Sequence, residues 1–205
     1  QCVAGDQQPP QRSPPPMPLI VGIGGTQRPN SISERLVRSV LEATARLGVE
    51  TRMFGGPELA QLPHYDPYHQ NRTALEIDFV EAVRAADGIV IASPSYHGGV
   101  SGLIKNAIDL LEELRLDERP YLDGRPVGLV VAAAGWQAGG VTLAALRGIV
   151  HAMRGWPTPM GIAINSVEQR PFDDSGALAD RQIAEQIEVM ARQLAAGCIG
   201  LSQRI

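Results

Sequence analysis

The feature that most constrains the fold of this chain is a regular alternation of short apolar runs with longer segments of helical periodicity. Five apolar runs lie at about 19–23, 49–54, 89–92, 127–134 and 160–164, and helical patterns lie at about 31–47, 73–86, 101–114, 141–154 and 178–196. An uninterrupted run such as Ile89-Val90-Ile91-Ala92 is typical of a strand buried on both faces. The alternation therefore predicts a three-layer α/β domain in which helices cover both faces of a five-stranded parallel sheet.

The first 18 residues are expected to lie outside this domain. They are rich in Gln, and six of them are proline. Such a segment has too little apolar content to offset the entropy cost of ordering. The sequence thus predicts a disordered tail over residues 1–18 and one domain over residues 19–205, which is long enough to bury a substantial core.

Charge and cysteine content exclude several classes of protein. The net charge of −4 argues against sequence-independent binding of nucleic acid, which needs a basic face. No apolar run approaches the roughly 18 residues that span a bilayer, and no secretory signal is recognisable. Cys2 and Cys198 lie at opposite ends without metal or redox spacing. We expect a cytoplasmic protein with no membrane, nucleic-acid or metal partner.

The segment after the first apolar run is suited to bind a phosphate. It reads Gly-Gly-Thr-Gln-Arg-Pro-Asn-Ser-Ile-Ser over residues 24–33. Glycines let backbone N–H groups approach an anion, and a helix start offers unpaired donors and the positive end of a dipole. Thr26, Ser31 and Ser33 add hydroxyl groups, and Arg28 adds a guanidinium. The alternative is an ordinary strand-to-helix turn with Ser31 as N-cap.

Two further polar, glycine-rich loops follow the third and fourth apolar runs, over residues 93–99 and 135–140. In doubly wound sheets a ligand binds at the carboxyl ends of the strands, where the strand order reverses. For the order 2-1-3-4-5 this point lies between strands one and three. We therefore expect the three loops to meet at one edge of the sheet.

A dinucleotide in the Rossmann manner does not fit these loops. The sixth position of the G-x-G-x-x-G pattern that begins at Gly22 is Gln27. The second strand ends near Arg52 and Phe54, without the acidic residue that would bind a ribose. A mononucleotide with one terminal phosphate fits the hydroxyl-rich loop better.

Two motifs resemble those of the NADPH-dependent FMN reductase family, which comprises flavodoxin-like quinone, azo-dye, chromate and flavin reductases. Residues 25–31, with Ser33 just beyond, resemble its G-S-x-R-x-x-S phosphate loop, and residues 94–109 resemble its P-x-Y…G-x-L-K-N-A-I-D block. The likeness covers about residues 19–164. The chain departs from the family pattern at Thr26, where serine is usual, and at Trp136 and Gln137, where small residues are frequent.

The resemblance implies a flavodoxin-like fold with noncovalently bound FMN. The FMN phosphate would be bound by Thr26, Arg28, Ser31 and Ser33. The isoalloxazine ring would lie along Pro94, Ser95, Tyr96, His97 and Gly98, with its pyrimidine side at Gly135, Trp136, Gln137 and Gly139. His97 is expected to contact the ring and not to transfer protons, because hydride transfer needs no protein base. Trp136 is a candidate border of the substrate space.

The implied activity is hydride transfer from NADPH or NADH to FMN, and then reduction of a small acceptor: a quinone, azo compound, metal oxyanion or free flavin. The alternative is a flavodoxin-type electron carrier with protein partners. Carriers typically have strongly acidic surroundings of the flavin and aromatic side chains on both ring faces. The modest charge and the glycines of the two later loops favour the reductase, because an open ring face lets a nicotinamide stack. Arg119 and Arg125 are candidate contacts for a dinucleotide phosphate.

The helical pattern at 103–114 has a wider apolar arc than a core-facing stripe requires. Its apolar residues are Leu103, Ile104, Ala107, Ile108, Leu110, Leu111 and Leu114. The excess would be covered either by the loop at 57–72 or by another subunit. Since members of the resembled family commonly dimerise through this region, the resemblance implies a homodimer or homotetramer.

Overall fold

Five parallel strands form the centre of the molecule. They are β1 (Leu19–Gly24), β2 (Glu50–Phe54), β3 (Gly88–Tyr96), β5 (Pro126–Ala133) and β6 (Trp156–Asn165), in the order β2-β1-β3-β5-β6. A two-residue strand, β4 (Gly99–Val100), pairs antiparallel with the end of β3. The computed structural model describes residues 17–69 and 71–202, so most of the predicted tail (1–18), including Cys2, lies outside the described residues. The predicted parallel sheet and its strand order are confirmed.

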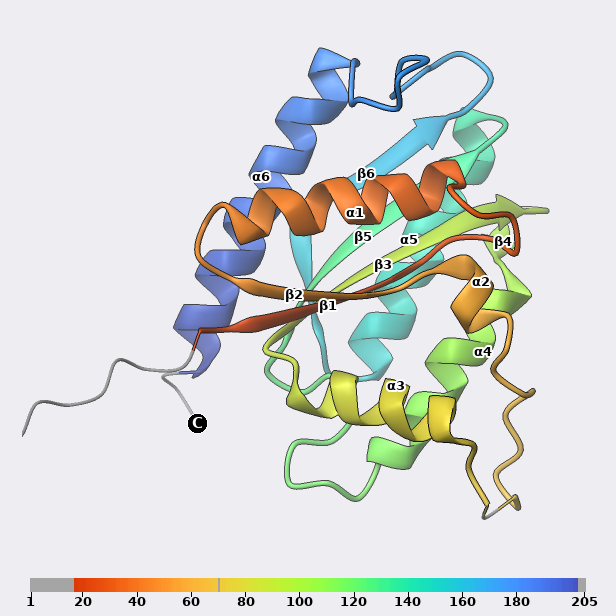
Figure 1. Cartoon of the computed structure of the whole chain (residues 1–205), viewed down its shortest axis with the longest axis vertical. Helices are drawn as coiled ribbons and strands as arrows, with labels where there is room; N and C mark the ends of the chain where they lie inside the picture. The colour runs from red at the N-terminus through yellow and green to blue at the C-terminus, as the bar shows by residue number, and fades with distance from the viewer. Residues whose placement is uncertain (1–16, 70, 203–205) are drawn as a thin grey trace, which may run out of the picture.

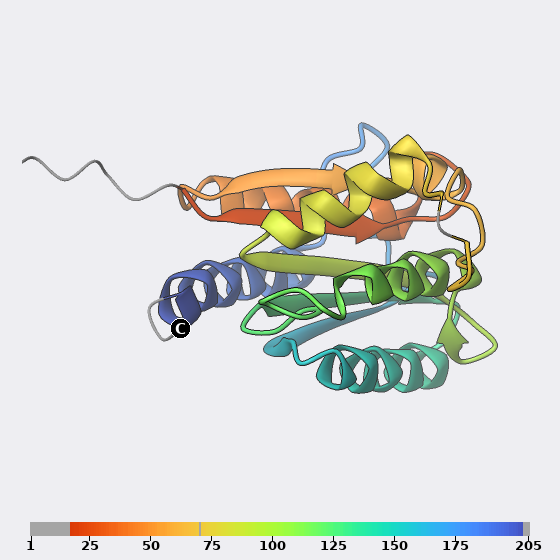
Figure 2. The ribbon, with the colours of Figure 1, turned by 90° about the horizontal axis from the view of Figure 1, so that it is seen from below.

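Helices cover both faces of this sheet (Figures 1 and 2). Helices α1 (Ile32–Ala45) and α6 (Arg181–Ser202) lie on one face. On the other face lie α3 (Ala74–Ala85), α4 (Gly102–Leu110), the 3₁₀ turn η1 (Leu111–Leu114) and α5 (Trp136–Ala152). The fold is therefore the expected three-layer α/β arrangement, with a short helix α2 (Gly56–Leu59) after β2.

The alternation of side chains along each strand divides the core in two. Ile20, Val90 and Val130 face α1 and α6, whereas Val21 and Leu129 face the layer of α3, α4 and α5. All five are at most 1% exposed. Because both faces are buried, the strands read as continuous apolar runs in the sequence.

Side-chain caps determine where three helices begin. Ser31 Oγ accepts the N–H of Glu34 at the start of α1, and Ser101 Oγ accepts that of Ile104 at the start of α4. Thr73 forms a reciprocal capping box with Glu76 at α3. These caps direct the polypeptide away from the carboxyl edge of the sheet at two of the three predicted ligand loops.

Several boundaries differ from the predicted ones. The predicted helix at 101–114 is divided into α4 and η1, and the predicted loop at 57–72 contains part of α2. Helix α6 extends to Ser202, beyond the predicted end near residue 196, and α5 begins at Trp136 although residues 135–140 were expected to form a loop. A Cβ on Gly139 would lie 3.6 Å from that of Ala163 and 3.7 Å from that of Ala133, so this turn packs closely on β5 and β6. Tertiary packing here outweighs the low helix propensity of glycine.

The prediction that Arg119 and Arg125 contact a dinucleotide phosphate is wrong. Arg125 is 1% exposed, and its guanidinium donates to the carbonyls of Ala86 (2.8 Å), Tyr121 (3.0 Å) and Arg84 (2.8 Å). Arg119 likewise donates to backbone carbonyls, including that of Asp123 at 2.8 Å. Both arginines precede β5 and lie at the amino edge of the sheet, opposite the predicted ligand site. Burial lowers the pKa of Arg125 to about 10.

Candidate cofactor-binding site

The loops after β1, β3 and β5 meet at the carboxyl edge of the sheet, as expected, and line two cavities. One cavity, of about 510 Å³, is lined by Thr26, Arg28, Asn30, Ser31, Ile32, Ser33, Arg35, Pro94, Ser95, Tyr96, Ala132, Ala133, Ala134 and Ser166. The other, of about 700 Å³, is lined by Ser95, His97, Gly98, Ala134, Gly135, Gln137, Ala138 and Val141. Ser95 and Ala134 belong to both, so the cavities adjoin. Trp136 and Gly139 line neither.

The loop at residues 25–31, called the phosphate loop here, has polar groups around the start of α1. Thr26 Oγ1 accepts the N–H of Arg28 at 3.2 Å, and the hydroxyls of Ser31 and Ser33 lie 3.3 Å apart. The Arg28 side chain is exposed, and within the described residues no carboxylate forms an ion pair with it. The first N–H groups of a helix have no intrahelical partner, and they lie at the positive end of its dipole. Ser31 does cap α1, since its Oγ accepts the N–H of Glu34. The same loop also carries groups that fit a phosphate, so the two roles are compatible.

The phosphate loop packs directly against the turn that follows β2. A Cβ on Gly56 would lie 1.7 Å from the carbonyl oxygen of Thr26, and a Cβ on Gly25 would lie 2.7 Å from the Gly56 nitrogen. The Glu34 side chain, paired with Arg38 at 3.3 Å, lies against Gly25 and Gly55. Residue 56 must therefore be glycine for the loop to keep this path. In the sequence, Gly55 and Gly56 simply follow the apolar run at 49–54, and nothing there indicates this contact.

The loop at residues 94–99, called the ring loop here, is a tight hairpin between β3 and β4. Tyr96 pairs with Gly99, and the two turn residues, His97 (φ 53°) and Gly98 (φ +76°), both have positive φ as a type I′ turn requires. Ser95 Oγ lies 2.7 Å from Thr142 Oγ1 and donates to the Ala138 carbonyl at 3.1 Å. The ring loop is thus tied to the first turns of α5. Nothing lies within 4 Å of a Cβ placed on Gly98 or Gly135, so the backbone there is open to a flat ligand.

Arg35 and Ser166 are among the residues of this site that the sequence reasoning did not name. Arg35 lies one helical turn after Ser31; its guanidinium is 3.8 Å from the centre of the Phe172 ring and donates to the Gly176 carbonyl at 3.0 Å. Because residues four apart lie on the same face of a helix, the position of Arg35 four residues after Ser31 could have indicated its place in the site. Ser166 directly follows β6, so the carboxyl-edge rule applied to the fifth strand would have found it.

Over residues 17–69 and 71–202, no group of three or more His, Cys, Asp or Glu side chains is arranged to bind a metal ion. In the same part of the chain, no helix combines the length and apolar character needed to cross a bilayer. The donor set at the carboxyl edge, namely hydroxyls, a guanidinium and a helix N-terminus, is suited to an anionic organic ligand.

Comparison with known proteins identifies relatives of this chain. The model of the family described as NADPH-dependent FMN reductase matches residues 18–169. An FMN-dependent NADPH-azoreductase of Staphylococcus haemolyticus (strain JCSC1435) is 36% identical over 103 residues, which are 50% of this chain and 51% of that protein. A protein of the same description from Staphylococcus aureus (strain NCTC 8325 / PS 47) is 33% identical over 158 residues, 73% of this chain and 78% of the relative.

Solved structures show the same fold. FerB, a flavoenzyme NAD(P)H:(acceptor) oxidoreductase from Paracoccus denitrificans, matches with a TM-score of 0.71 at 19% identity, over 90% of this chain and 98% of FerB. A Streptococcus pneumoniae flavodoxin matches with a TM-score of 0.58 at 15% identity, over 87% of this chain and 98% of the flavodoxin. At such identities the likeness concerns the fold alone, which is flavodoxin-like.

A flavodoxin-like fold with hydroxyls, a guanidinium and a helix N-terminus at its carboxyl edge is typical of the class of proteins that bind a mononucleotide there. Within that class, the chain belongs to the NADPH-dependent FMN reductase family. The family membership confirms the expected oxidoreductase class and its use of FMN and NADPH.

Proposed function

We propose that the protein is an FMN-dependent NAD(P)H oxidoreductase that reduces a small acceptor, with FMN bound across the two adjoining cavities. The main support for this proposal is that two different environments adjoin at the carboxyl edge of the sheet. The phosphate loop offers hydroxyls, a guanidinium that forms no ion pair with any described residue, and a helix N-terminus, and the neighbouring cavity has open glycine backbone. A phosphate and a flat ring need these two environments side by side.

The residues fit the parts of FMN in turn. Thr26, Arg28, Ser31 and Ser33 would hold the phosphate. Pro94, Ser95, Tyr96, His97 and Gly98 would lie along the ring, with Gly135, Trp136, Gln137 and Gly139 on the segment nearest its pyrimidine side. Bound FMN would accept a hydride from the nicotinamide and pass two electrons to the acceptor; for a quinone, NADPH, H⁺ and quinone give NADP⁺ and hydroquinone.

The chain's own residues would orient the ring and leave one face of it accessible. The hydrogen bonds that join Ser95 to Thr142 and to the Ala138 carbonyl fix the ring loop relative to α5. The N-terminus of α5, beginning at Trp136, would place the positive end of its dipole near the pyrimidine side and so stabilise negative charge there. With no side chain at Gly98 and Gly135, a nicotinamide can approach the ring at stacking distance.

Anaerobic stopped-flow mixing tests the activity and separates it from the electron-carrier alternative. Protein loaded with FMN is mixed with NADPH and, separately, with NADH, while the visible absorbance of the flavin is followed. We expect rapid bleaching by at least one nucleotide. Reduction only by dithionite or a protein partner would instead support a carrier, which the net charge of −4 and the matched family disfavour.

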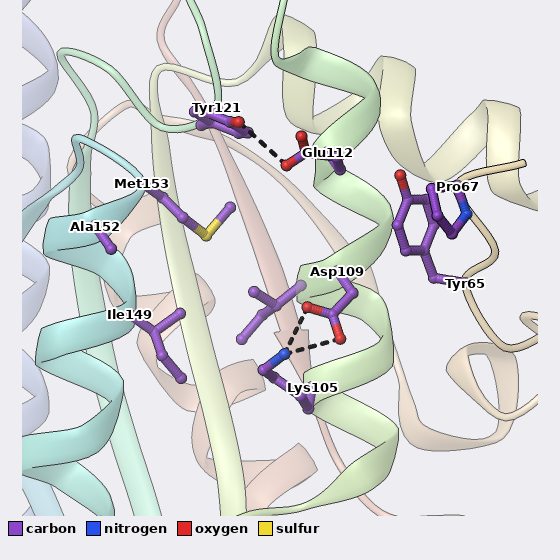
Figure 3. Close-up of a pocket in the computed structure, with 10 residues that line it drawn as sticks. Tyr65, Pro67, Lys105, Asp109, Glu112, Tyr121, Ile149, Ala152 and Met153 are labelled. Carbon is purple, nitrogen blue, oxygen red and sulfur yellow. Dashed lines mark hydrogen bonds and ion pairs between the residues drawn. The ribbon is translucent and has the colours of Figure 1, made fainter.

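We also propose that the protein forms a homodimer or homotetramer through α4 and α5. A groove of about 550 Å³ lies between these helices, with Ile149, Ala152 and Met153 on the α5 side (Figure 3). On the α4 side Lys105 pairs with Asp109 at 2.6 Å. The groove would be covered in an assembly.

The apolar arc of α4 itself is less open than the sequence suggested. The six residues Ile104, Ala107, Ile108, Leu110, Leu111 and Leu114 are each at most 4% exposed within one chain. Asn106 fastens the 57–72 segment beside them, donating to the Pro63 carbonyl and accepting the Tyr65 N–H, both at 2.8 Å. The assembly proposal therefore depends on the groove and the family resemblance. Sedimentation at micromolar concentration tests it, and a monomer alone would contradict it.

A cytoplasmic location, tested by cell fractionation, stays a prediction.

A further inference from the structure

Trp136 and Glu168 form a hydrogen-bonded pair between the ends of two neighbouring strands. The indole Nε1–H of Trp136, in the first turn of α5 after β5, donates to Glu168 Oε2 at 2.8 Å. Glu168 lies on the turn after β6. The indole keeps 51% of its surface exposed although its N–H is bonded. A large aromatic ring is thus fixed in orientation while its surface remains accessible.

The turn that carries Glu168 is itself firmly attached to β5. The N–H of Ser166 donates to the Ala133 carbonyl at 2.7 Å, and Ser166 Oγ donates to the same oxygen at 3.0 Å. Gln169 closes the turn with two hydrogen bonds to Asn165. Its N–H donates to the Asn165 carbonyl at 2.8 Å, and its side-chain Oε1 accepts the Asn165 N–H at 3.0 Å. The backbone that carries Glu168 is therefore fixed relative to β5, and the hydrogen bond to Trp136 orients its exposed carboxylate.

The pair lies at the rim of the cofactor site on its β6 side. The neighbours of Trp136 in sequence, Gly135 and Gln137, line one cavity, and Ser166, two residues before Glu168, lines the other. Among the described residues, nothing lies within 4 Å of a Cβ placed on Gly135 or Gly140, so the backbone next to Trp136 and one turn further along α5 is open. The rim thus carries one flat apolar surface and one exposed carboxylate.

We propose that Trp136, positioned by Glu168, determines which electron acceptor the protein reduces. The indole offers a face on which a planar, uncharged aromatic acceptor such as a quinone can stack. The carboxylate of Glu168 disfavours an anionic acceptor such as chromate at the same rim. This inference rests on the proposed function, and it narrows the acceptor to uncharged planar aromatic molecules.

Acceptor kinetics of the FMN-loaded enzyme test the proposal, with NADPH as donor and with menadione and chromate as the two acceptors. Trp136→Ala should raise the ratio of the KM for menadione to the KM for chromate about tenfold, because only the aromatic acceptor loses a stacking partner. Glu168→Gln keeps a hydrogen-bond acceptor but removes the charge, and should lower KM for chromate about threefold at low salt while leaving menadione unchanged. Equal changes for both acceptors, or none, would overturn the proposal.

A spectroscopic measurement separates this inference from the proposed function. The chain has two tryptophans, and the second, Trp156, begins β6 at the end of that strand far from Glu168. In a Trp156→Phe background the tryptophan emission therefore comes from Trp136 alone. Adding FMN should quench this emission, and Glu168→Ala should alter it before FMN is added. If FMN does not bind, the proposed function fails. If FMN binds and NADPH reduces it, but the ratio of the two KM values is the same in all variants, only the acceptor inference fails.

Discussion

At the amino edge of the sheet the guanidinium of Arg125 is buried and donates to three backbone carbonyls, whereas at the carboxyl edge Arg28 is exposed and no carboxylate of the described residues pairs with it. The amino edge satisfies its polar groups internally. The carboxyl edge leaves a guanidinium, helix N–H groups and glycine backbone for a ligand. Substitutions at the two edges should therefore separate stability from cofactor binding.

The largest effect is expected from Arg125→Met. This substitution leaves three carbonyls without their donor, so the free energy of unfolding should fall by about 3–5 kcal/mol in denaturant titrations. Arg181→Ala, at an ion pair whose arginine is 93% exposed, is the matched control and should change stability by less than about 0.5 kcal/mol. A mild effect of Arg125→Met would show that the amino edge does not depend on this residue.

In contrast to Arg125→Met, Arg28→Ala should weaken FMN binding and leave stability unchanged. The loss of a charge-assisted contact to phosphate should weaken FMN binding by about 1.5–3 kcal/mol, measured by quenching of flavin fluorescence. Stability without FMN should be unchanged, since Arg28 makes no ion pair within the described residues. Arg46→Ala, at the other end of α1 in an ion pair with Glu188, controls for charge and should leave FMN affinity unaltered. Equal affinities of the two variants would contradict the phosphate assignment.

Gly56→Ala should affect both properties at the carboxyl edge. The added methyl group would meet the carbonyl oxygen of Thr26, so the phosphate loop must move. We expect a loss of about 1–3 kcal/mol in stability together with weaker FMN binding. Gly148→Ala, inside α5 with nothing within 4 Å of the new Cβ, should instead stabilise the protein by up to about 1 kcal/mol. Unchanged FMN affinity in Gly56→Ala would show that the loop tolerates displacement.

The smallest effect concerns pH and the amino edge. Burial raises the pKa of the Cys198 thiol from 9.0 to about 12, so the folded protein keeps a proton that the unfolded chain loses above pH 9. The thiol's contribution to stability is complete below pH 9 and declines toward pH 12, by up to about 1.4 kcal/mol per pH unit. Urea titrations of wild type and Cys198→Ala between pH 8 and about 10.5 should therefore converge. Parallel pH profiles would contradict this account.

The parallel sheet and the meeting of three loops could be predicted from local pattern, whereas the strand order was implied by the resemblance to a flavodoxin-like family. Runs such as residues 89–92 are apolar throughout because they are buried on both faces, and strand–helix alternation then requires parallel pairing. The sequence also contained the information needed to place Arg125, because a residue just before a strand lies at the amino edge of the sheet, away from ligands. The wrong prediction came from considering its charge without its position.

Other features could not be predicted because they arise only in the folded chain. The contact of Gly56 with Thr26 joins two turns that are distant in sequence, and the hydrogen bond from Trp136 to Glu168 joins residues separated by 32 positions. The hairpin at His97 and Gly98 is too short for any periodicity to indicate it. The glycines at the start of α5 indicated a loop, whereas in the fold Gly139 packs on β5 and β6 and the segment is helical.

Helix α6 follows all the described strands in the chain, and it supplies Ile183, Ile187, Met190 and Leu194, all at most 2% exposed, to the core. When the ribosome has synthesised residue 165, the part of that sheet face which α1 does not cover stays exposed until α6 emerges. A nascent chain at that stage exposes an apolar surface of the kind that aggregates. Chaperone capture during translation should therefore be greatest between the synthesis of β6 and the release of α6.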